Sequence, residues 1–327
     1  MLGPERNSTS VNGSWPTPPV VISDMSFELR KHLPRIKERS MAEFQRLEDQ
    51  AHMLASAPII FTGLTGDWPA LTNHPWSKPS YLLSHTFGGR RLVPVEVGRS
   101  YLDAGWGQKL VKFGDFMREY IEPGNQQHLA LLTGDTSQAG GKAAKAPVGY
   151  LAQHQLFSQL PQLYKDVTIP DICFTSPSRH PIDPSKDLPQ LDMPQLNAWF
   201  GPGGTITPLH TDPYHNLLVQ VVGRKYVRLY APCHSAKLRP MGKENGVDMS
   251  NTSSVDVGVM EGWDARPVAD GGEGDEDWKF ELRKAEFKSV PFVDCILEPG
   301  ETLHIPVGWW HYVRSLSVSF SVSFWWN

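Results

Sequence analysis

The stretch Thr205-Ile206-Thr207-Pro208-Leu209-His210-Thr211-Asp212 decides how this chain folds and what it can bind. His210 and Asp212 are two positions apart, so on a β-strand both side chains leave the same face. A second stretch, far along the chain, is Ile305-Pro306-Val307-Gly308-Trp309-Trp310-His311 and brings another histidine. Two histidines and one carboxylate can occupy one face of an octahedral Fe(II) ion and leave the opposite positions open.

The His-x-Asp pair alone is a weak signal. With 12 histidines and 35 acidic residues, roughly one such match is expected by chance. His210 with Asp212 is the only match, and in isolation it would more often be accidental. Its surroundings strengthen it, because strand-like runs at 217–230, 295–305 and 318–325 flank the three residues. Ligands at strand ends in a β-rich region are typical of a barrel that holds a metal at its mouth.

Composition is that of an ordinary globular protein. The chain has 327 residues, 40% of them hydrophobic, and a net charge of −4, which gives no basic field for nucleic acid. No apolar run is long enough to span a bilayer, and residues 1–10 are too polar for a signal peptide. Cys173, Cys233 and Cys295 are odd in number and far apart, which favours a reducing compartment. We therefore expect an intracellular protein of the nucleus, the cytoplasm or both, and not a secreted one.

The chain divides into three parts. Residues 1–20 are rich in Ser, Asn, Pro and Gly, which predicts a disordered tail. Residues 21–134 predict helices beginning at Met41, Pro79 and Phe113, with short strands at 58–61 and 92–97. Residues 135–327 begin with a Gly/Ala/Lys-rich connection, 135–147, and are then rich in strand signals. A long segment at about 238–279, which we call the insertion, is expected to be a solvated surface loop.

Two hairpins are predicted in the last part. One pairs 217–222 with 226–230 around Gly223-Arg224, and the other pairs 293–297 with 302–305. Residues 317–324 alternate strictly, with apolar side chains on one face and serines on the other. Helices first and many short strands afterwards predict an α+β chain, mainly β, with a barrel core.

These residues resemble a known family, the JmjC-domain Fe(II)/2-oxoglutarate oxygenases. The resemblance covers roughly residues 55–327 and rests on the strings at 197–216, 219–230 and 306–326. Within the family, the strings at 93–98, 150–157 and 309–314 most resemble the lysine demethylase 8 branch, and the asparaginyl hydroxylase called factor inhibiting HIF is also similar. The resemblance implies a double-stranded β-helix (cupin or jelly-roll) core behind an N-terminal helical region. It also implies that His210, Asp212 and His311 bind Fe(II).

The resemblance further implies 2-oxoglutarate as cosubstrate, with O₂. Lys225 matches the cation that holds the far carboxylate, and Tyr150 and Thr207 match positions that hydrogen-bond that carboxylate. Asn216 matches a position near the chelating end. Two of these matches have a simpler alternative, because a lysine such as Lys225 at a strand start is usually solvated and a tyrosine such as Tyr150 is more often part of the core.

The candidate substrate residues rest on less. Trp199 could line the cosubstrate pocket or stack on a cationic substrate side chain, or it could be a core tryptophan. Glu96 could pair with that cation, although a charged residue facing outward on a strand is the simpler account. Gln153 and His154 are candidates for the substrate access. His304 is expected not to be a ligand, because it lies off the apolar alternation of its strand.

The resemblance implies a dioxygenase that acts on a protein side chain and releases succinate and CO₂. We expect C–H hydroxylation of an arginyl or other residue, in a partner such as a histone, ribosomal or chromatin protein, without direct nucleic-acid or membrane binding. N-methyl-lysine demethylation of a histone is the alternative, since the same iron chemistry serves both reactions. A non-catalytic cupin-type binding module is a third hypothesis, against which the intact triad and Lys225 argue.

Overall fold

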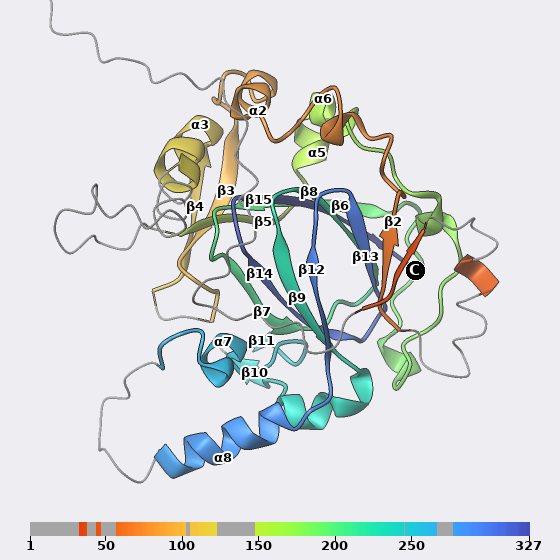
Figure 1. Cartoon of the computed structure of the whole chain (residues 1–327), viewed down its shortest axis with the longest axis vertical. Coiled ribbons are helices and arrows are strands. Elements are labelled where there is room, and N and C mark those ends of the chain that lie inside the picture. The colour runs from red at the N-terminus through yellow and green to blue at the C-terminus, as the bar shows by residue number, and fades with distance from the viewer. Residues whose placement is uncertain are drawn as a thin grey trace, which may run out of the picture.

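Two β-sheets face each other and enclose the centre of the molecule (Figure 1). The structure, a computed structural model, describes residues 33–37, 44–46, 57–102, 105–122, 148–244, 246–266 and 277–327. The tail predicted at 1–20 and the connection at 135–147 lie outside these residues, as does most of the helix predicted from Met41. Because the sheets are built from short strands far apart in the sequence, the mainly β, jelly-roll prediction is confirmed.

The larger sheet has nine strands in the order β1-β2-β13-β8-β15-β6-β5-β3-β4, and the smaller has four in the order β12-β9-β14-β7. The strands of the larger sheet are β1 (Arg35–Lys37), β2 (Ile59–Thr62), β3 (Leu92–Val97), β4 (Gly107–Lys112), β5 (Gly149–His154), β6 (Gln195–Gly201), β8 (His215–Val222), β13 (Glu301–Ile305) and β15 (Ser319–Trp326). The smaller sheet consists of β7 (Ile206–His210), β9 (Lys225–Tyr230), β12 (Val293–Leu297) and β14 (Trp310–Ser315).

Helical segments cover the outside of both sheets. They are η1 (Pro69–Leu71), α2 (Pro79–His85), α3 (Phe113–Phe116), η2 (Met117–Ile121), α5 (Leu156–Gln159), α6 (Pro161–Tyr164), η4 (Asp171–Phe174), η5 (Pro184–Lys186), η6 (Pro232–Leu238), α7 (Val257–Glu261) and α8 (Asp277–Lys288). The helix predicted to begin at Pro79 and the strand predicted at 92–97 are confirmed as α2 and β3. The helix predicted from Phe113 is confirmed, although its second half, η2, is a turn of π-helix. None of the described helices is long and apolar enough to cross a membrane.

Both predicted hairpins are wrong. β8 pairs with β13 and β15 in the larger sheet, whereas β9 pairs with β12 and β14 in the smaller one. β12 and β13 likewise belong to different sheets. The short turns that looked like hairpin loops therefore carry the chain from one sheet to the other, which is how a double-stranded β-helix is wound.

Gly223 makes the first of these crossings possible. Its φ is +69°, a left-handed conformation in which a residue with a Cβ is strained. A Cβ there would also collide with the carbonyl of Val318 at the start of β15. Strand periodicity cannot distinguish such a crossing from a two-residue hairpin turn, because both place a glycine between two apolar strands.

Three apolar clusters form the core. The largest lies between the outer face of the larger sheet and the helices, and includes Phe200, Phe320 and Trp76. A second lies inside the barrel, around Val227 and Leu303. The third lies between the outer face of the smaller sheet and α7 and α8. The central strands β8, β9, β14 and β15 are therefore buried on both faces, whereas β4 is largely exposed.

The serines of β15 illustrate this. The apolar residues of the alternation pack into the helix-covered core, and the serines face the barrel interior instead of solvent. Ser321 donates to Gln220 at 2.7 Å, and Ser323 accepts from the indole of Trp199 at 2.9 Å. Because these hydroxyls satisfy other buried polar groups, a polar strand face can line a closed interior.

The insertion is not a surface loop throughout. It contains η6, the short pair β10 (Lys243–Glu244) and β11 (Val247–Asp248), and α7, and α8 begins at Asp277 near its end. Val255 and Val257 are buried in the cluster beneath the smaller sheet. Thr252 forms a β-bridge with His210, so the insertion contacts the strand that carries the first predicted metal ligand. Most of the acidic stretch at 270–277 lies outside the described residues.

Candidate metal and cosubstrate site

His210, Asp212 and His311 come together at one end of the barrel. His210 ends β7, Asp212 follows it, and His311 lies on the neighbouring strand β14, where it pairs directly with His210. One ligand atom from each of the three lies within 4.8 Å of the others. Within the described part of the chain, this is the single group of three or more such residues arranged to hold a metal ion.

Backbone carbonyls orient both imidazoles. Nδ1 of His210 lies 2.8 Å from the carbonyl oxygen of Pro208, and Nδ1 of His311 lies 3.1 Å from that of Trp309. A carbonyl can only accept, so each Nδ1 donates a proton. Each Nε2 is then the ligand atom, and these two nitrogens face Asp212 at 3.4 and 3.5 Å. The strand geometry thus fixes the tautomer that a metal needs.

Asp212 is held as a carboxylate. Burial by itself would raise its pKa, but the adjacent His311 and His210 side chains outweigh burial and hold the pKa well below its usual range. The side-chain amide of Asn216 donates to Oδ2 of Asp212 at 2.9 Å. The Oδ1 atom of Asn216 is buried and has no hydrogen-bond partner among the described residues. Asn216 therefore positions the carboxylate and keeps an acceptor available beside it.

Lys225 lies deeper in the barrel, at the start of β9. Its side chain is buried, and its ammonium group contacts the hydroxyl of Tyr150 at 3.3 Å. No carboxylate of the described residues forms an ion pair with it. Burial without a counter-charge lowers the pKa of Lys225 to about 7. A buried lysine without a counter-ion is costly unless a bound anion supplies one.

Other predicted cosubstrate residues surround this lysine. One narrow cavity is lined by the three predicted metal ligands together with Lys225, Tyr150, Thr207, Asn216 and Trp199. Thr207 hydrogen-bonds to the Tyr150 hydroxyl, although burial dominates and raises the pKa of that hydroxyl above its ordinary value. The Trp199 ring lies against the Tyr150 ring, with centroids 6.1 Å apart. Apolar side chains of Leu218, Ile305 and Val313 complete the lining.

Glu96 lies beside this cavity, on β3 directly opposite Tyr150. It accepts a hydrogen bond from the indole of Trp106 at 3.4 Å. Burial raises the pKa of its carboxyl, and hydrogen bonds from Trp106 and Gln108 oppose that effect. Tyr101 is close enough for Glu96 and Asp212 both to add to the rise that burial causes in its pKa. Glu96 and Tyr101 therefore stand near the metal triad at the opening of the barrel.

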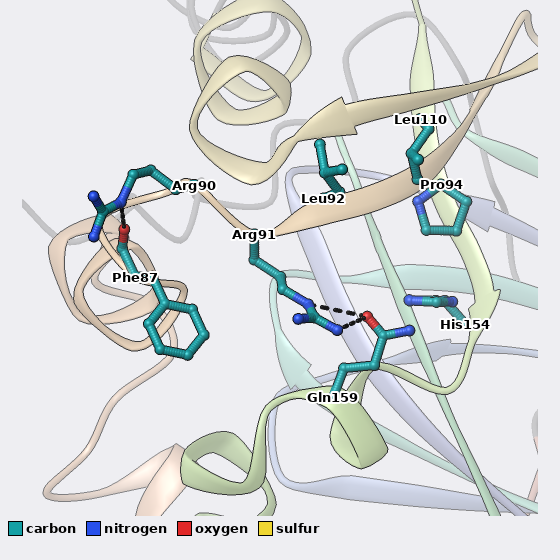
Figure 2. Close-up of a pocket in the computed structure, with 8 residues that line it drawn as sticks. All are labelled: Phe87, Arg90, Arg91, Leu92, Pro94, Leu110, His154 and Gln159. Atoms are coloured by element: carbon teal, nitrogen blue, oxygen red, sulfur yellow. Dashed lines mark hydrogen bonds between the residues drawn. The ribbon is translucent and has the colours of Figure 1, made fainter.

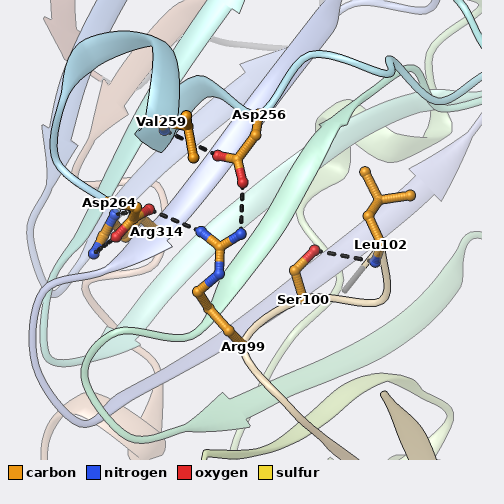
Figure 3. A network of polar contacts seen from close by, with 7 residues as sticks. All are labelled: Arg99, Ser100, Leu102, Asp256, Val259, Asp264 and Arg314. Atoms are coloured by element: carbon orange, nitrogen blue, oxygen red, sulfur yellow. Dashed lines mark hydrogen bonds and ion pairs between the residues drawn. The ribbon is translucent and has the colours of Figure 1, made fainter. Parts of the chain in front are cut away.

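A polar network holds the loop that carries Tyr101 (Figure 3). The guanidinium of Arg99 donates to Asp256 at 2.5 Å and to Asp264 at 2.9 Å. Asp264 also accepts two hydrogen bonds from Arg314 on β14, at 2.9 and 3.0 Å. Because β14 carries His311, this network joins the opening, the insertion and a ligand strand.

The other predicted residues lie elsewhere. Neither Gln153 nor His154 lines the metal cavity. His154 lines a separate groove at the outer end of β5. Gln153 precedes it with a left-handed backbone, at a φ of +46°. His304 is fully buried outside the group of His210, Asp212 and His311, and Nε2 of its ring lies 3.2 Å from Nδ1 of His215. Burial lowers the pKa of His304 to about 3, so it is neutral in the folded protein.

Sequence reasoning missed the contribution of the insertion and of the loop before β4. Tyr101 reaches the opening and is hydrogen-bonded to Thr252, which bridges to His210. No periodic pattern marks these residues, since both lie outside the barrel strands. Arg99 and Asp264, one a lone basic and the other a lone acidic residue in a loop, likewise gave no signal in sequence.

The donors fit both a metal and a dicarboxylate. Two imidazole nitrogens and one carboxylate oxygen match the preferred ligands of Fe(II), and all three residues line one cavity. The uncompensated buried ammonium of Lys225 fits a carboxylate, and the Tyr150 and Thr207 hydroxyls lie beside it. These donors line one cavity, so a single small molecule could contact the metal and the lysine together.

Comparison with known proteins agrees with this arrangement. The cupin-like domain family matches residues 45–327. The chain is 40% identical to lysine-specific demethylase 8 of Danio rerio over 297 residues, covering 91% of this chain and 59% of that protein. It is 36% identical to lysine-specific demethylase JMJ30 of Arabidopsis thaliana, covering 94% and 60%. It is 35% identical to Jumonji C domain-containing protein 5 of Drosophila melanogaster, covering 90% and 60%. The chain thus spans about three-fifths of the length of these relatives.

Proposed function

Because the chain belongs to the cupin-like family and carries the JmjC domain, we propose that it is an Fe(II)- and 2-oxoglutarate-dependent dioxygenase that oxidises a cationic side chain of a protein. The observation that carries this proposal is the pairing of the His-Asp-His group with Lys225, a buried cation without a counter-ion, in one cavity.

Each part of the cavity has a task in this reaction. His210, Asp212 and His311 would hold Fe(II), and Lys225 with Tyr150 and Thr207 would hold the far carboxylate of 2-oxoglutarate. When bound, the metal, 2-oxoglutarate and O₂ supply the oxidising chemistry and leave succinate and CO₂. Asn216 keeps Asp212 oriented, and the apolar lining excludes water around the reacting groups.

The opening of the barrel favours a positively charged substrate side chain. Glu96 is partly buried there, and a cation beside it would offset the cost of burying its charge. Trp199 and Tyr150 offer aromatic faces near the same place. Arginine and methyl-lysine both satisfy these requirements.

The names of the relatives support N-methyl-lysine demethylation, because several of them are called lysine-specific demethylases. Arginyl hydroxylation remains a second candidate on the strength of Glu96, since a carboxylate can accept two parallel hydrogen bonds from a guanidinium. A trimethylated ammonium has no N–H to donate, so the Glu96 carboxylate favours arginine over it. The two reactions differ in what they leave on the substrate.

Mass spectrometry of peptides can test the proposal. Arginine-containing and methyl-lysine-containing peptides would be incubated with the full chain, Fe(II), 2-oxoglutarate and O₂. Loss of a methyl group with release of formaldehyde identifies a demethylase, and a stable gain of one oxygen identifies a hydroxylase. Asp212→Ala should lower turnover at least about 100-fold, whereas Asp115→Ala, which changes a carboxylate on α3, should leave it unchanged.

Succinate measured in the same reactions shows whether the proposed function is contradicted. Succinate formation equal in wild type and Asp212→Ala would remove the triad from the reaction. Binding of metal and 2-oxoglutarate without any succinate, with or without peptide, would favour the binding module instead.

A further inference from the structure

A second hollow lies on the outer part of the larger sheet, apart from the metal cavity (Figure 2). It is a groove of about 720 Å³ over the exposed face of β3 and β4. Its lining residues are Phe87, Arg90, Arg91, Leu92, Pro94, Leu110, His154 and Gln159. The proposed reaction at the metal makes no use of this groove.

The floor of the groove is apolar and exposed. Pro94 lies directly opposite Leu110 in the β3–β4 pair. Leu92 is 48% exposed, Leu110 is 66% exposed and Phe87 at the rim is 61% exposed. The opposite face of β3 carries Val93 and Val95, which are fully buried in the core. Gathered apolar side chains that remain open to solvent typically mark a binding surface.

The rim of the groove is basic. Nε and one terminal nitrogen of Arg91 both donate to Oε1 of Gln159, at 3.1 and 2.7 Å, which fixes the plane of its guanidinium. Arg90 is anchored by donation to the Phe87 carbonyl at 2.9 Å. Burial and the nearby Arg91 lower the pKa of His154, so the two arginines carry the positive charge of the rim, and none of the described residues that line the groove is a carboxylate. A fixed guanidinium without an acidic partner is suited to recognise a carboxylate.

One face of β3 leads from the groove toward Glu96 at the opening of the barrel. Leu92, Pro94 and Glu96 alternate along β3, so all three side chains leave the same face. Glu96 and Leu92 are four positions apart, or roughly 13 Å at the rise of an extended chain. β4 is the outermost strand of this sheet in the described part of the chain. An extended peptide with one side chain at Glu96 would therefore place a residue about four positions away in the groove.

We propose that this groove binds the flank of the protein substrate, and that it selects acidic and apolar residues about four positions from the residue that is oxidised. This inference rests on the proposed function for its substrate. Leu92, Pro94 and Leu110 contact the apolar side chain, and Arg91 with Arg90 pairs with the carboxylate. The metal cavity then selects the residue to be oxidised, and the groove selects its sequence context.

Peptide binding tests the groove independently of catalysis. Fluorescein-labelled peptides would carry a central arginine or trimethyl-lysine in a Gly/Ser background. Positions three to five from the centre, on one side or the other, would be Glu-Leu-Glu, Gln-Leu-Gln or Lys-Leu-Lys. Anisotropy titrations would compare the full-length wild type with Arg91→Glu, Arg90→Glu and, as a matched control on the distant helix α8, Arg283→Glu.

We expect the wild type to bind the acidic peptides about tenfold more tightly than the basic ones, a difference of about 1.4 kcal/mol. Arg91→Glu should reverse that order. If Arg91→Glu does not fold, Arg90→Glu provides the test and should weaken the preference for acidic over basic peptides. Arg283→Glu should keep the wild-type order. Equal binding of acidic and basic peptides by the wild type, or equal loss in Arg91→Glu and Arg283→Glu, would overturn the proposal.

Turnover of the same peptides separates the two proposals. If acidic peptides bind in a way that depends on Arg91 but no peptide is oxidised, peptide binding by the groove is supported and the oxygenase proposal is contradicted. Oxidation at a rate that depends neither on the flanking charge nor on Arg91 would support the oxygenase proposal and contradict substrate binding by the groove.

Discussion

Lys225 is a buried basic residue without an acidic partner among the described residues. Such a group stabilises nothing in the free protein, because its charge lost its hydration on folding. Its pKa of about 7 in the fold lies far below the ordinary 10.5. Between these two values the unfolded chain binds a proton that the folded chain does not, so this residue makes the stability of the free protein increase with pH across that range.

The same shift predicts how 2-oxoglutarate binding depends on pH. Binding of its far carboxylate requires the protonated lysine, so the dissociation constant should rise about tenfold for each pH unit above roughly 7. The Lys225→Met variant should bind 2-oxoglutarate weakly at every pH. Its free energy of unfolding should be about 1–2 kcal/mol greater than that of the wild type. Calorimetric titration with 2-oxoglutarate and a urea unfolding curve measure the two effects.

Lys243→Met is the matched control, since Lys243 is an exposed lysine on β10. It should alter neither quantity. A pH-independent affinity in the wild type would mean that Lys225 is charged in the free protein or does not contact the cosubstrate.

Single residues differ in how far the sequence reveals them. His210, Asp212 and His311 could be proposed from spacing and strand pattern, because metal ligands must share one face of a strand or lie at strand ends. Lys225 could be proposed only through the family resemblance, since a lysine at a strand start is ordinarily solvated. Tyr101 could not be proposed, because a long-range contact with Thr252 brings it to the opening.

Among the elements, the strands were predicted well and their partners were not. β3 was predicted to the residue, and the strands predicted at 217–222, 226–230, 293–297 and 302–305 correspond to β8, β9, β12 and β13, whereas β14, which carries His311, was not predicted as a strand. The predicted hairpins failed because pairing depends on where a turn directs the chain, which at Gly223 follows from its contact with Val318. The buried middle of the insertion was missed because its few apolar residues, such as Val255 and Val257, show no regular period.

The loop that holds Tyr101 depends on one arginine. Arg99 pairs with Asp256 and Asp264 of the insertion, and its side chain is only 26% exposed. Arg99→Gln should loosen the opening and raise KM for a protein substrate several-fold, with a smaller effect on kcat, because the metal ligands are untouched. We expect a loss of about 1–2 kcal/mol in stability from the broken charged hydrogen bonds.

Arg118→Gln provides the comparison, because Arg118 forms an exposed pair with Asp115 within one helical turn. It should change stability by less than about 0.5 kcal/mol and leave KM unchanged. An Arg99 variant with normal KM for peptide would show that the loop contributes to folding alone.

For the whole molecule, the cavity joins the two sheets. Lys225 and the metal ligands come from the smaller sheet and the residues after it, whereas Tyr150, Trp199 and Asn216 come from the larger sheet. A ligand that contacts both groups should therefore oppose separation of the sheets, and the sheets should unfold together.

Ligand-induced stabilisation follows from this arrangement. Mn²⁺ with 2-oxoglutarate, each at about 100 times its dissociation constant, should each contribute about 2.7 kcal/mol. For a chain of this size the melting temperature should then rise by roughly 10 °C or more. Differential scanning calorimetry, with EDTA to reverse the metal effect and Asp212→Ala as the control, measures the shift. An identical rise in Asp212→Ala would place the metal elsewhere.

β9 and β12 pair directly, although the whole segment from residue 231 to residue 292 separates them. The strand pairing that closes the barrel therefore does not depend on the length of the exposed parts of that segment. Yet the same segment bridges to His210 through Thr252 and holds Arg99 and Tyr101 at the opening. Changes in the exposed parts of this connection can thus alter the substrate range of the chain while the barrel strands and the metal ligands remain as they are.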